Sequence, residues 1–133
     1  MESTLCDWHR PHPLRLPSLG PGIEGDGAER IEAALGRLAR QPNVRGLVLF
    51  GSRARREARA DSDLDLLVLE RQPHLEGEAL RQAWWRAYQL LEDLPLPLDL
   101  VVAGSADADR LAGSRWHVIS HAAREGQVLY VAE

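Results

Sequence analysis

The chain has 133 residues, of which 44% are hydrophobic and 27% are charged, as expected of one soluble globular domain. Its net charge of −4 disfavours nucleic acid as the main partner, and no apolar run approaches the roughly 18 residues of a membrane-spanning helix. Cys6 is the only cysteine, which excludes an internal disulfide and a cysteine-based zinc site, so that a reducing, cytoplasmic setting is expected.

Residues 1–27 are predicted to form an extended or poorly ordered N-terminal arm. Four of the eight prolines and four of the 11 glycines lie in this segment, which also lacks the basic start and apolar core of a secretory signal. Several apolar side chains could pack onto the domain or onto a partner, or the arm could be loose: Trp8, Leu14, Leu16 and Leu19. Residues 28–133 contain no internal repeat and are expected to form one domain.

The first half of this domain predicts a helix followed by two strands. Ala28–Arg40 carries apolar residues at the i, i+3, i+4 and i+7 positions of an amphipathic helix. Val44–Phe50 is an apolar run typical of a buried strand, and Asp63–Leu69 is predicted to be the second strand. Between them, Arg53–Arg59 is short, polar and composed of good helix formers, so a short helix is expected there.

The second half alternates helices and strands. Ser114 is a candidate N-cap for the last helix, and Gly126 stands just past the end of that helix. The predicted elements are a long helix over Glu78–Leu94, a strand over Leu98–Ala103, short helices over Ser105–Ala112 and Ser114–Glu125, and a final strand over Val128–Val131.

The first two strands are predicted to run antiparallel. Only ten residues separate Ser52 from Asp63, whereas a parallel crossover normally takes a dozen or more. An antiparallel pair also brings the end of the first strand beside the start of the second. The predicted fold class is therefore α/β (α+β), a small mixed sheet with helices packed on it, and not a doubly wound Rossmann sheet.

Asp63 and Asp65 are the leading candidates for chemistry. Residues i and i+2 of a strand point to the same face, so the two carboxylates should repel each other unless a hard divalent cation lies between them. Asp99 interrupts another apolar strand, where a carboxylate is costly to bury unless it is paired. Aspartates also occur at strand starts as turn residues, but the shared face and the third aspartate favour a metal site. An EF-hand is excluded, because Leu66 and Gln72 occupy its glycine and glutamate positions.

Gly51-Ser52 is a candidate phosphate turn, because glycine allows close backbone approach and serine supplies a hydroxyl. All 16 basic residues are arginines, so no P-loop lysine is available. Arg53 is the nearest arginine and could contact the phosphates. The other arginines of this segment have simpler interpretations: a solvated face for Arg55 and Arg56, and pairing with Asp61 or Asp63 for Arg59. His117 and His121 have one-face spacing for zinc but lack an accompanying glutamate, so zinc binding is disfavoured.

The pattern Gly-Ser, ten residues, Asp-x-Asp, with a later Asp in an apolar strand, resembles the DNA polymerase beta-like nucleotidyltransferase superfamily. The stretch GSRARREARADSDLDLLV is most similar to its minimal nucleotidyltransferase (MNT) branch, over about Ile31 to Val131. The resemblance implies a small mixed sheet and transfer of a nucleoside monophosphate from an NTP to a hydroxyl. It also implies roles for particular residues: Gly51, Ser52 and Arg53 for the triphosphate, and Asp63, Asp65 and Asp99 for catalysis and two Mg²⁺ ions.

Small members of this branch are typically encoded beside a helical HEPN protein. The resemblance therefore implies an MntA-like antitoxin of a HEPN/MNT pair, which uses Mg-ATP to attach AMP to the HEPN-type toxin. Two alternatives stay open. One is an aminoglycoside-type enzyme acting on a small molecule, although such proteins usually carry a further helical domain. The other is a binding antitoxin whose catalysis is incidental.

Overall fold

Residues 5–133 are described by this computed structural model, and residues 1–4 of the predicted arm lie outside the described range. The described elements are α1 (Gly27–Ala39), β1 (Val44–Phe50), α2 (Gly51–Arg55), β2 (Leu64–Glu70), α3 (Gly77–Leu90), β3 (Leu98–Gly104), α4 (Ser105–Ala112), α5 (Val118–Glu125) and β4 (Gln127–Val131). None of these helices combines the length and the apolar character needed to cross a membrane.

The four strands form one mixed sheet in the order β3-β2-β1-β4. β1 pairs antiparallel with both β2 and β4, whereas β2 and β3 run parallel. The parallel pair is joined through α3, as a parallel crossover requires. The predicted mixed sheet and the predicted antiparallel pairing of the first two strands are both confirmed.

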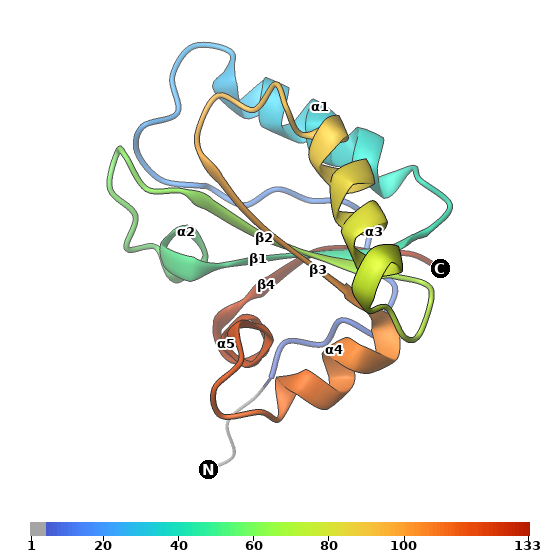
Figure 1. Cartoon of the computed structure of the whole chain (residues 1–133). Helices are drawn as coiled ribbons and strands as arrows, with labels where there is room; N and C mark the ends of the chain where they lie inside the picture. Colours follow the sequence, from blue (N-terminus) through green and yellow to red (C-terminus); the bar gives the residue numbers. More distant parts are fainter. Residues whose placement is uncertain (1–4) are drawn as a thin grey trace.

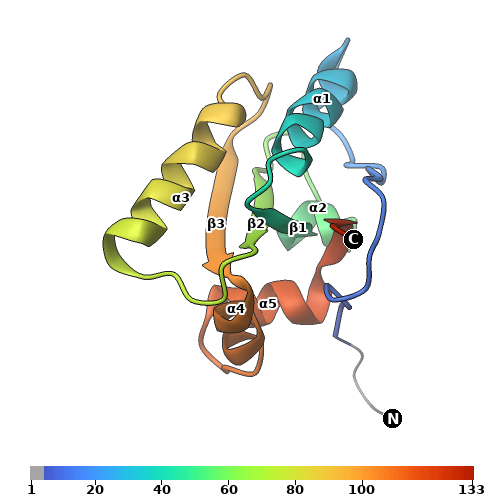
Figure 2. The same ribbon diagram turned by 90° about the vertical axis from the view of Figure 1, so that its right-hand side faces the viewer.

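Helices cover both faces of the sheet. α1 and α3 lie on one face, and α4 and α5 lie on the other (Figures 1 and 2). Side chains alternate accordingly along β2, where Leu66 packs in the core under α1 and α3 and Leu67 packs in the core on the opposite face. The same alternation places Asp65, two residues before Leu67, on the face of α4 and α5.

Some element boundaries differ from the prediction. α2 ends at Arg55 because Arg56 adopts the left-handed conformation with φ of 62°, which breaks the helix. α3 ends at Leu90 and not at Leu94. The predicted N-cap of the last helix is wrong: α5 begins at Val118, and the Nδ1 atom of His117 accepts a hydrogen bond of 3.1 Å from the Ile119 N–H. Gly126 does follow the end of α5, as predicted.

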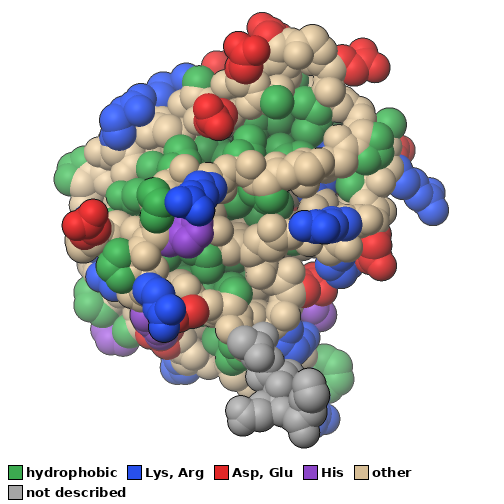
Figure 3. Space-filling view, turned by 180° about the vertical axis from the view of Figure 1, so that it is seen from behind, with side chains coloured by type: hydrophobic (Ala, Val, Ile, Leu, Met, Phe, Trp, Pro, Cys, Tyr) green, Lys and Arg blue, Asp and Glu red, His purple; other side chains and the backbone are tan. Residues whose placement is uncertain are grey.

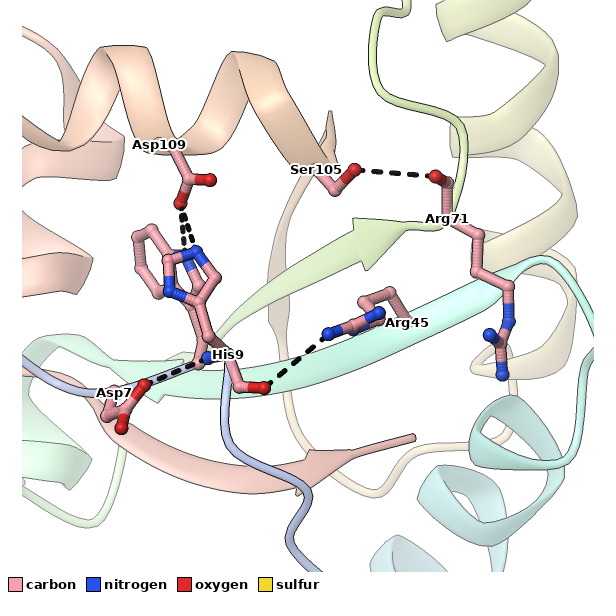
Figure 4. Close-up of polar contacts among 7 residues, drawn as sticks. Asp7, His9, Arg45, Arg71, Ser105 and Asp109 are labelled. Carbon is pink, nitrogen blue, oxygen red and sulfur yellow. Dashed lines mark hydrogen bonds and ion pairs between the residues drawn. The ribbon is translucent and has the colours of Figure 1, made fainter. Parts of the chain in front are cut away.

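The N-terminal arm packs onto the domain. Trp8 and Leu19 are buried, and the backbone of His12 forms a β-bridge with Val131 at the outer edge of β4. Asp109 of α4 accepts a hydrogen bond of 2.9 Å from the Trp8 Nε1 atom and lies 2.7 Å from the Nε2 atom of His9, as drawn in Figure 4. Of the two alternatives for the arm, the structure therefore supports packing onto the domain.

Candidate active site

Three neighbouring strands bring the candidate residues to one end of the sheet. Phe50, the last residue of β1, pairs with Asp65 of β2, and Asp65 in turn pairs with Asp99 of β3. Gly51 and Ser52 follow Phe50 and begin α2, which lies at that end of β1 (Figure 1). The turn and two of the carboxylates therefore converge because β1 and β2 are antiparallel while β2 and β3 are parallel and in register.

Gly51 is the residue on which this convergence depends. Its φ of 74° lies in the left-handed region, which disfavours residues with a side chain. A Cβ atom at this position would also collide with the Asp65 carboxylate. The carboxylate therefore lies directly against the backbone of the Gly-Ser turn, and any larger residue would have to displace it.

The electrostatics of the site are dominated by crowded negative charge. Burial, the charge and hydrogen bond of Asp99, and the charge of Asp63 together raise the pKa of Asp65 to about 6. Asp99 is exposed, and Asp63 lies exposed one residue before β2. A pair of carboxylates in contact, with a third close enough to act on the first, is a set of hard oxygen donors that a divalent cation would stabilise.

The carboxylates of Asp63, Asp65 and Asp99 are suitable ligands for a metal ion, but the structure does not bring all three together. Asp65 and Asp99 are neighbours across the parallel strands, and Asp63 acts on Asp65 through its charge. Within residues 5–133, no three His, Cys, Asp or Glu side chains are gathered into one ligand group. Two carboxylates therefore form the centre of the site, and Asp63 stands at its margin.

The structure gives Arg53 a different position from the one that was predicted. Its side chain is 1% exposed, and its guanidinium donates hydrogen bonds to backbone carbonyl groups of the arm and of the loop before Asp63. In this position the donors of the side chain are taken up by backbone carbonyls, which does not favour contact with a triphosphate. The role of Arg53 as a phosphate ligand stays a prediction.

Arg55 is the arginine that acts on the carboxylates, which the sequence reasoning missed. Its positive charge lowers the pKa of Asp65, opposing the four effects that raise it. Its guanidinium also lies 2.8 Å from Glu57 and 2.9 Å from Glu125. One signal could have identified Arg55, since it follows Gly51 by four residues, about one helical turn.

The remaining polar candidates lie in structural roles. His117 caps α5, and the Nδ1 atom of His121 lies 3.3 Å from an arginine nitrogen of Arg124. Among the described residues, Arg59 forms no ion pair with Asp61 or Asp63. These side chains therefore add no ligand to the site.

Comparisons with known proteins can now be set beside this geometry. Residues 29–129 match the family described as the nucleotidyltransferase domain. No curated protein sequence matches the chain. A solved protein from Sulfolobus solfataricus, assigned as a nucleotidyltransferase, is 17% identical with a TM-score of 0.51, covering 77% of this chain and 75% of that one. That likeness shows a shared fold.

Two further solved structures have lower TM-scores than the first. One is a toxin–antitoxin structure with AMP-PNP, which is 23% identical with a TM-score of 0.46 and covers 79% of this chain and 73% of that one. The other is a complex of tri-AMPylated Shewanella oneidensis HEPN toxin with MNT antitoxin, which is 22% identical with a TM-score of 0.44 and covers 77% and 73%. At these TM-scores the two likenesses carry no argument about this chain.

Proposed function

The chain belongs to the family of nucleotidyltransferase domains, and on that basis we propose that it transfers AMP from ATP to a hydroxyl group of a partner protein. The observation that carries this proposal is the contact between the Gly51 turn and Asp65, with Asp99 beside it. A turn that suits a phosphate and carboxylates that suit a divalent cation are the two parts that phosphoryl-group chemistry requires.

In this proposal the turn holds the nucleotide. The left-handed Gly51 exposes backbone where a side chain would otherwise stand, and Ser52 offers its hydroxyl to a phosphate oxygen. Arg55 is the arginine best placed to oppose negative charge at the site, although it must share its guanidinium with Glu57 and Glu125.

Asp63, Asp65 and Asp99 would hold two Mg²⁺ ions. Bound there, the ions would neutralise charge on the attacking and leaving oxygens of an in-line displacement. Asp99 is exposed at the edge strand, where it could take the proton of the acceptor hydroxyl. No protein nucleophile is required, since the acceptor oxygen attacks the α-phosphorus directly and pyrophosphate leaves.

The proposed acceptor is a HEPN-type toxin, and this part rests on the resemblance of the Gly-Ser and Asp-x-Asp pattern to the MNT branch. Nucleic acid is disfavoured by the net charge of −4. On the face seen in Figure 3, the basic side chains of the described residues are scattered among neutral and hydrophobic surface and form no continuous band. A nucleic-acid-binding protein usually presents such a band.

The test uses the full chain, the protein that co-purifies with it, magnesium and ATP labelled at the α-phosphate. The proposal predicts label on the partner protein, absent when magnesium is chelated. Label on an aminoglycoside or another small molecule would support a small-molecule enzyme instead. A partner that stays unlabelled but is silenced by stoichiometric binding would contradict the catalytic proposal and support a binding antitoxin.

A further inference from the structure

Arg53 is a fully buried arginine that bonds to two separate segments of the chain. Its Nη1 atom donates to the carbonyl oxygens of Leu19, at 2.6 Å, and Pro21, at 3.0 Å, in the arm. Its Nε and Nη2 atoms donate to the carbonyl oxygen of Ser62, at 3.2 and 2.9 Å, and Nη2 lies 3.5 Å from the carbonyl of Arg59. The side chain has no carboxylate partner among the described residues.

A buried charge with only carbonyl partners is a specific arrangement. Taking a guanidinium out of water is costly unless each donor is satisfied, and here backbone carbonyls supply all the acceptors. Hydrogen bonds to a charged group are stronger than those between neutral groups. The arm and the loop before β2 are therefore held together by this one side chain.

A second contact joins the same two segments without Arg53. Gly22 of the arm has a φ of 93°, and a Cβ atom at this position would collide with the backbone carbonyl of Ala60. Only glycine allows the arm to approach the loop this closely. The arm therefore touches residues 59–62 at two independent points.

The loop held in this way leads directly into the active site. Ser62, whose carbonyl accepts two of the Arg53 hydrogen bonds, immediately precedes Asp63. On the other side of Asp63, the Leu64 N–H donates a hydrogen bond of 2.8 Å to the Pro97 carbonyl. The backbone of Asp63 is thus fixed from both sides, by Arg53 before it and by the start of β2 after it.

We propose that Arg53 is a positioning residue that clamps the N-terminal arm onto residues 59–62 and thereby sets the place of Asp63 at the metal site. The arm is then part of the active site's framework, although it contributes no ligand. This inference rests on the proposed nucleotidyltransferase function for its catalytic consequence. Its structural consequence, a loop ordered by the arm, holds independently of any activity.

The test compares Arg53→Lys and Gly22→Ala with Gly25→Ala in the full chain. Lysine keeps the charge but cannot span carbonyls of both segments, and Gly22→Ala disturbs the arm–loop contact without changing Arg53. Gly25 is the matched control, because its φ of 58° is also positive but its Cβ would meet nothing within 4 Å. If Arg53→Lys fails to fold, Gly22→Ala still carries the test.

Three readouts are needed. In metal-free protein, amide hydrogen exchange over residues 57–63 should be faster in both test variants. Mn²⁺ affinity, measured by electron paramagnetic resonance with an ATP analogue that carries a methylene group between its α and β phosphates, should fall about tenfold. In the transfer assay, kcat should fall at least about tenfold while the KM for ATP changes less, as expected when a ligand is misplaced by about 1 Å.

Unchanged exchange and unchanged Mn²⁺ affinity in both test variants would overturn the proposal. The proposal would also be overturned if Gly25→Ala changed exchange and Mn²⁺ affinity as much as Gly22→Ala does. The changes would then be caused by backbone strain in the arm and not by loss of the contact with the loop. If the wild-type chain transfers nothing, the proposed function fails, but the exchange and Mn²⁺ measurements still decide the role of Arg53.

Discussion

Asp65 is the side chain on which the charges of the site converge. It lies against the Gly51 backbone and pairs across the sheet with Asp99, and the negative charge of Asp63 contributes to its raised pKa. Burial and these carboxylates raise its pKa to about 6, so the folded protein binds this proton more tightly than the unfolded chain does. The stability that this proton provides is present below the unfolded pKa of about 4 and is lost as the pH rises through 6.

Asp65→Asn should therefore stabilise the metal-free protein at pH 8. We expect about 1 kcal/mol, well below the full value of the pKa shift, because the carboxyl is only half-buried and solvent screens the repulsion. The gain should shrink towards zero at pH 4. Urea unfolding in EDTA at both pH values measures it. Asp61→Asn, in an exposed part of the preceding loop, is the control and should change nothing at either pH.

Glu70 offers the same test away from the active site. It is 3% exposed at the end of β2, where burial raises its pKa despite a 2.7 Å hydrogen bond from Asn43 and an ion-pair contact of 3.7 Å with Arg86. Its ionised form is therefore disfavoured in the fold, and Glu70→Gln should raise stability at neutral pH but not below pH 4. Thermal unfolding that shows a loss at pH 7 would contradict this.

At the residue scale, the sequence predicted the carboxylates better than the arginines. Asp63 and Asp65 could be singled out by their i, i+2 spacing at a strand start, and Asp99 by its apolar neighbours. The structure half-buries Asp65 but leaves Asp63 and Asp99 exposed, so the burial cost expected for Asp99 does not arise. Arg53 and Arg55 are the same residue type and lie two positions apart, and only the tertiary structure distinguishes their roles. Arg53 finds its partners in the arm, more than 30 residues away in sequence, which no local pattern indicates.

At the element scale, the strands were predicted more closely than the ends of the helices. β1 was predicted with its observed bounds, and the antiparallel pairing followed from the short connection to β2. α2 is shorter than predicted because Arg56 adopts a left-handed conformation, which helix propensity does not indicate for arginine. Ser114 was a plausible cap by residue type, but His117 caps α5 instead.

The arm is the element whose behaviour composition predicted least well. Prolines and glycines indicate an irregular segment, which is what the structure contains, but they cannot indicate whether that segment packs. Trp8 lies buried in the core under α4 and α5, and its indole N–H is paired with Asp109. The arm is held by its apolar side chains, by Arg53 and by backbone hydrogen bonds to β4 such as those of the His12–Val131 bridge, and not by a helix or a full strand of its own.

Trp8→Ala should destabilise the protein by about 3 kcal/mol, as large-to-small substitutions of buried aromatic residues do. The loss of stability should lie towards the lower end of the range for such substitutions, because the arm can detach locally while the rest of the domain stays folded. Urea unfolding monitored by far-ultraviolet circular dichroism measures the loss. Trp116→Ala is the matched control, because Trp116 is 88% exposed and its removal should cost almost nothing. A loss under about 0.5 kcal/mol for Trp8→Ala would mean that the arm does not contribute to the core.

At the scale of the whole molecule, the fold explains why a short chain can hold such a site. One antiparallel and one parallel strand pair, side by side, bring a turn and two carboxylates to the same end of the sheet. The helices on both faces supply the core that holds these strands in register (Figure 2). This arrangement indicates the type of reaction. It does not indicate the acceptor, because the acceptor is a separate molecule and its recognition depends on residues outside this site.

The most direct test of the central claim compares ATP labelled at the α-phosphate with ATP labelled at the γ-phosphate, using the co-purified partner and magnesium. Nucleotidyl transfer predicts that the α-label reaches the partner, that the γ-label does not, and that Asp63→Asn abolishes transfer while the variant stays folded. Transfer of the γ-label would indicate a phosphotransferase, and undiminished α-label transfer by folded Asp63→Asn would contradict the assignment of this site.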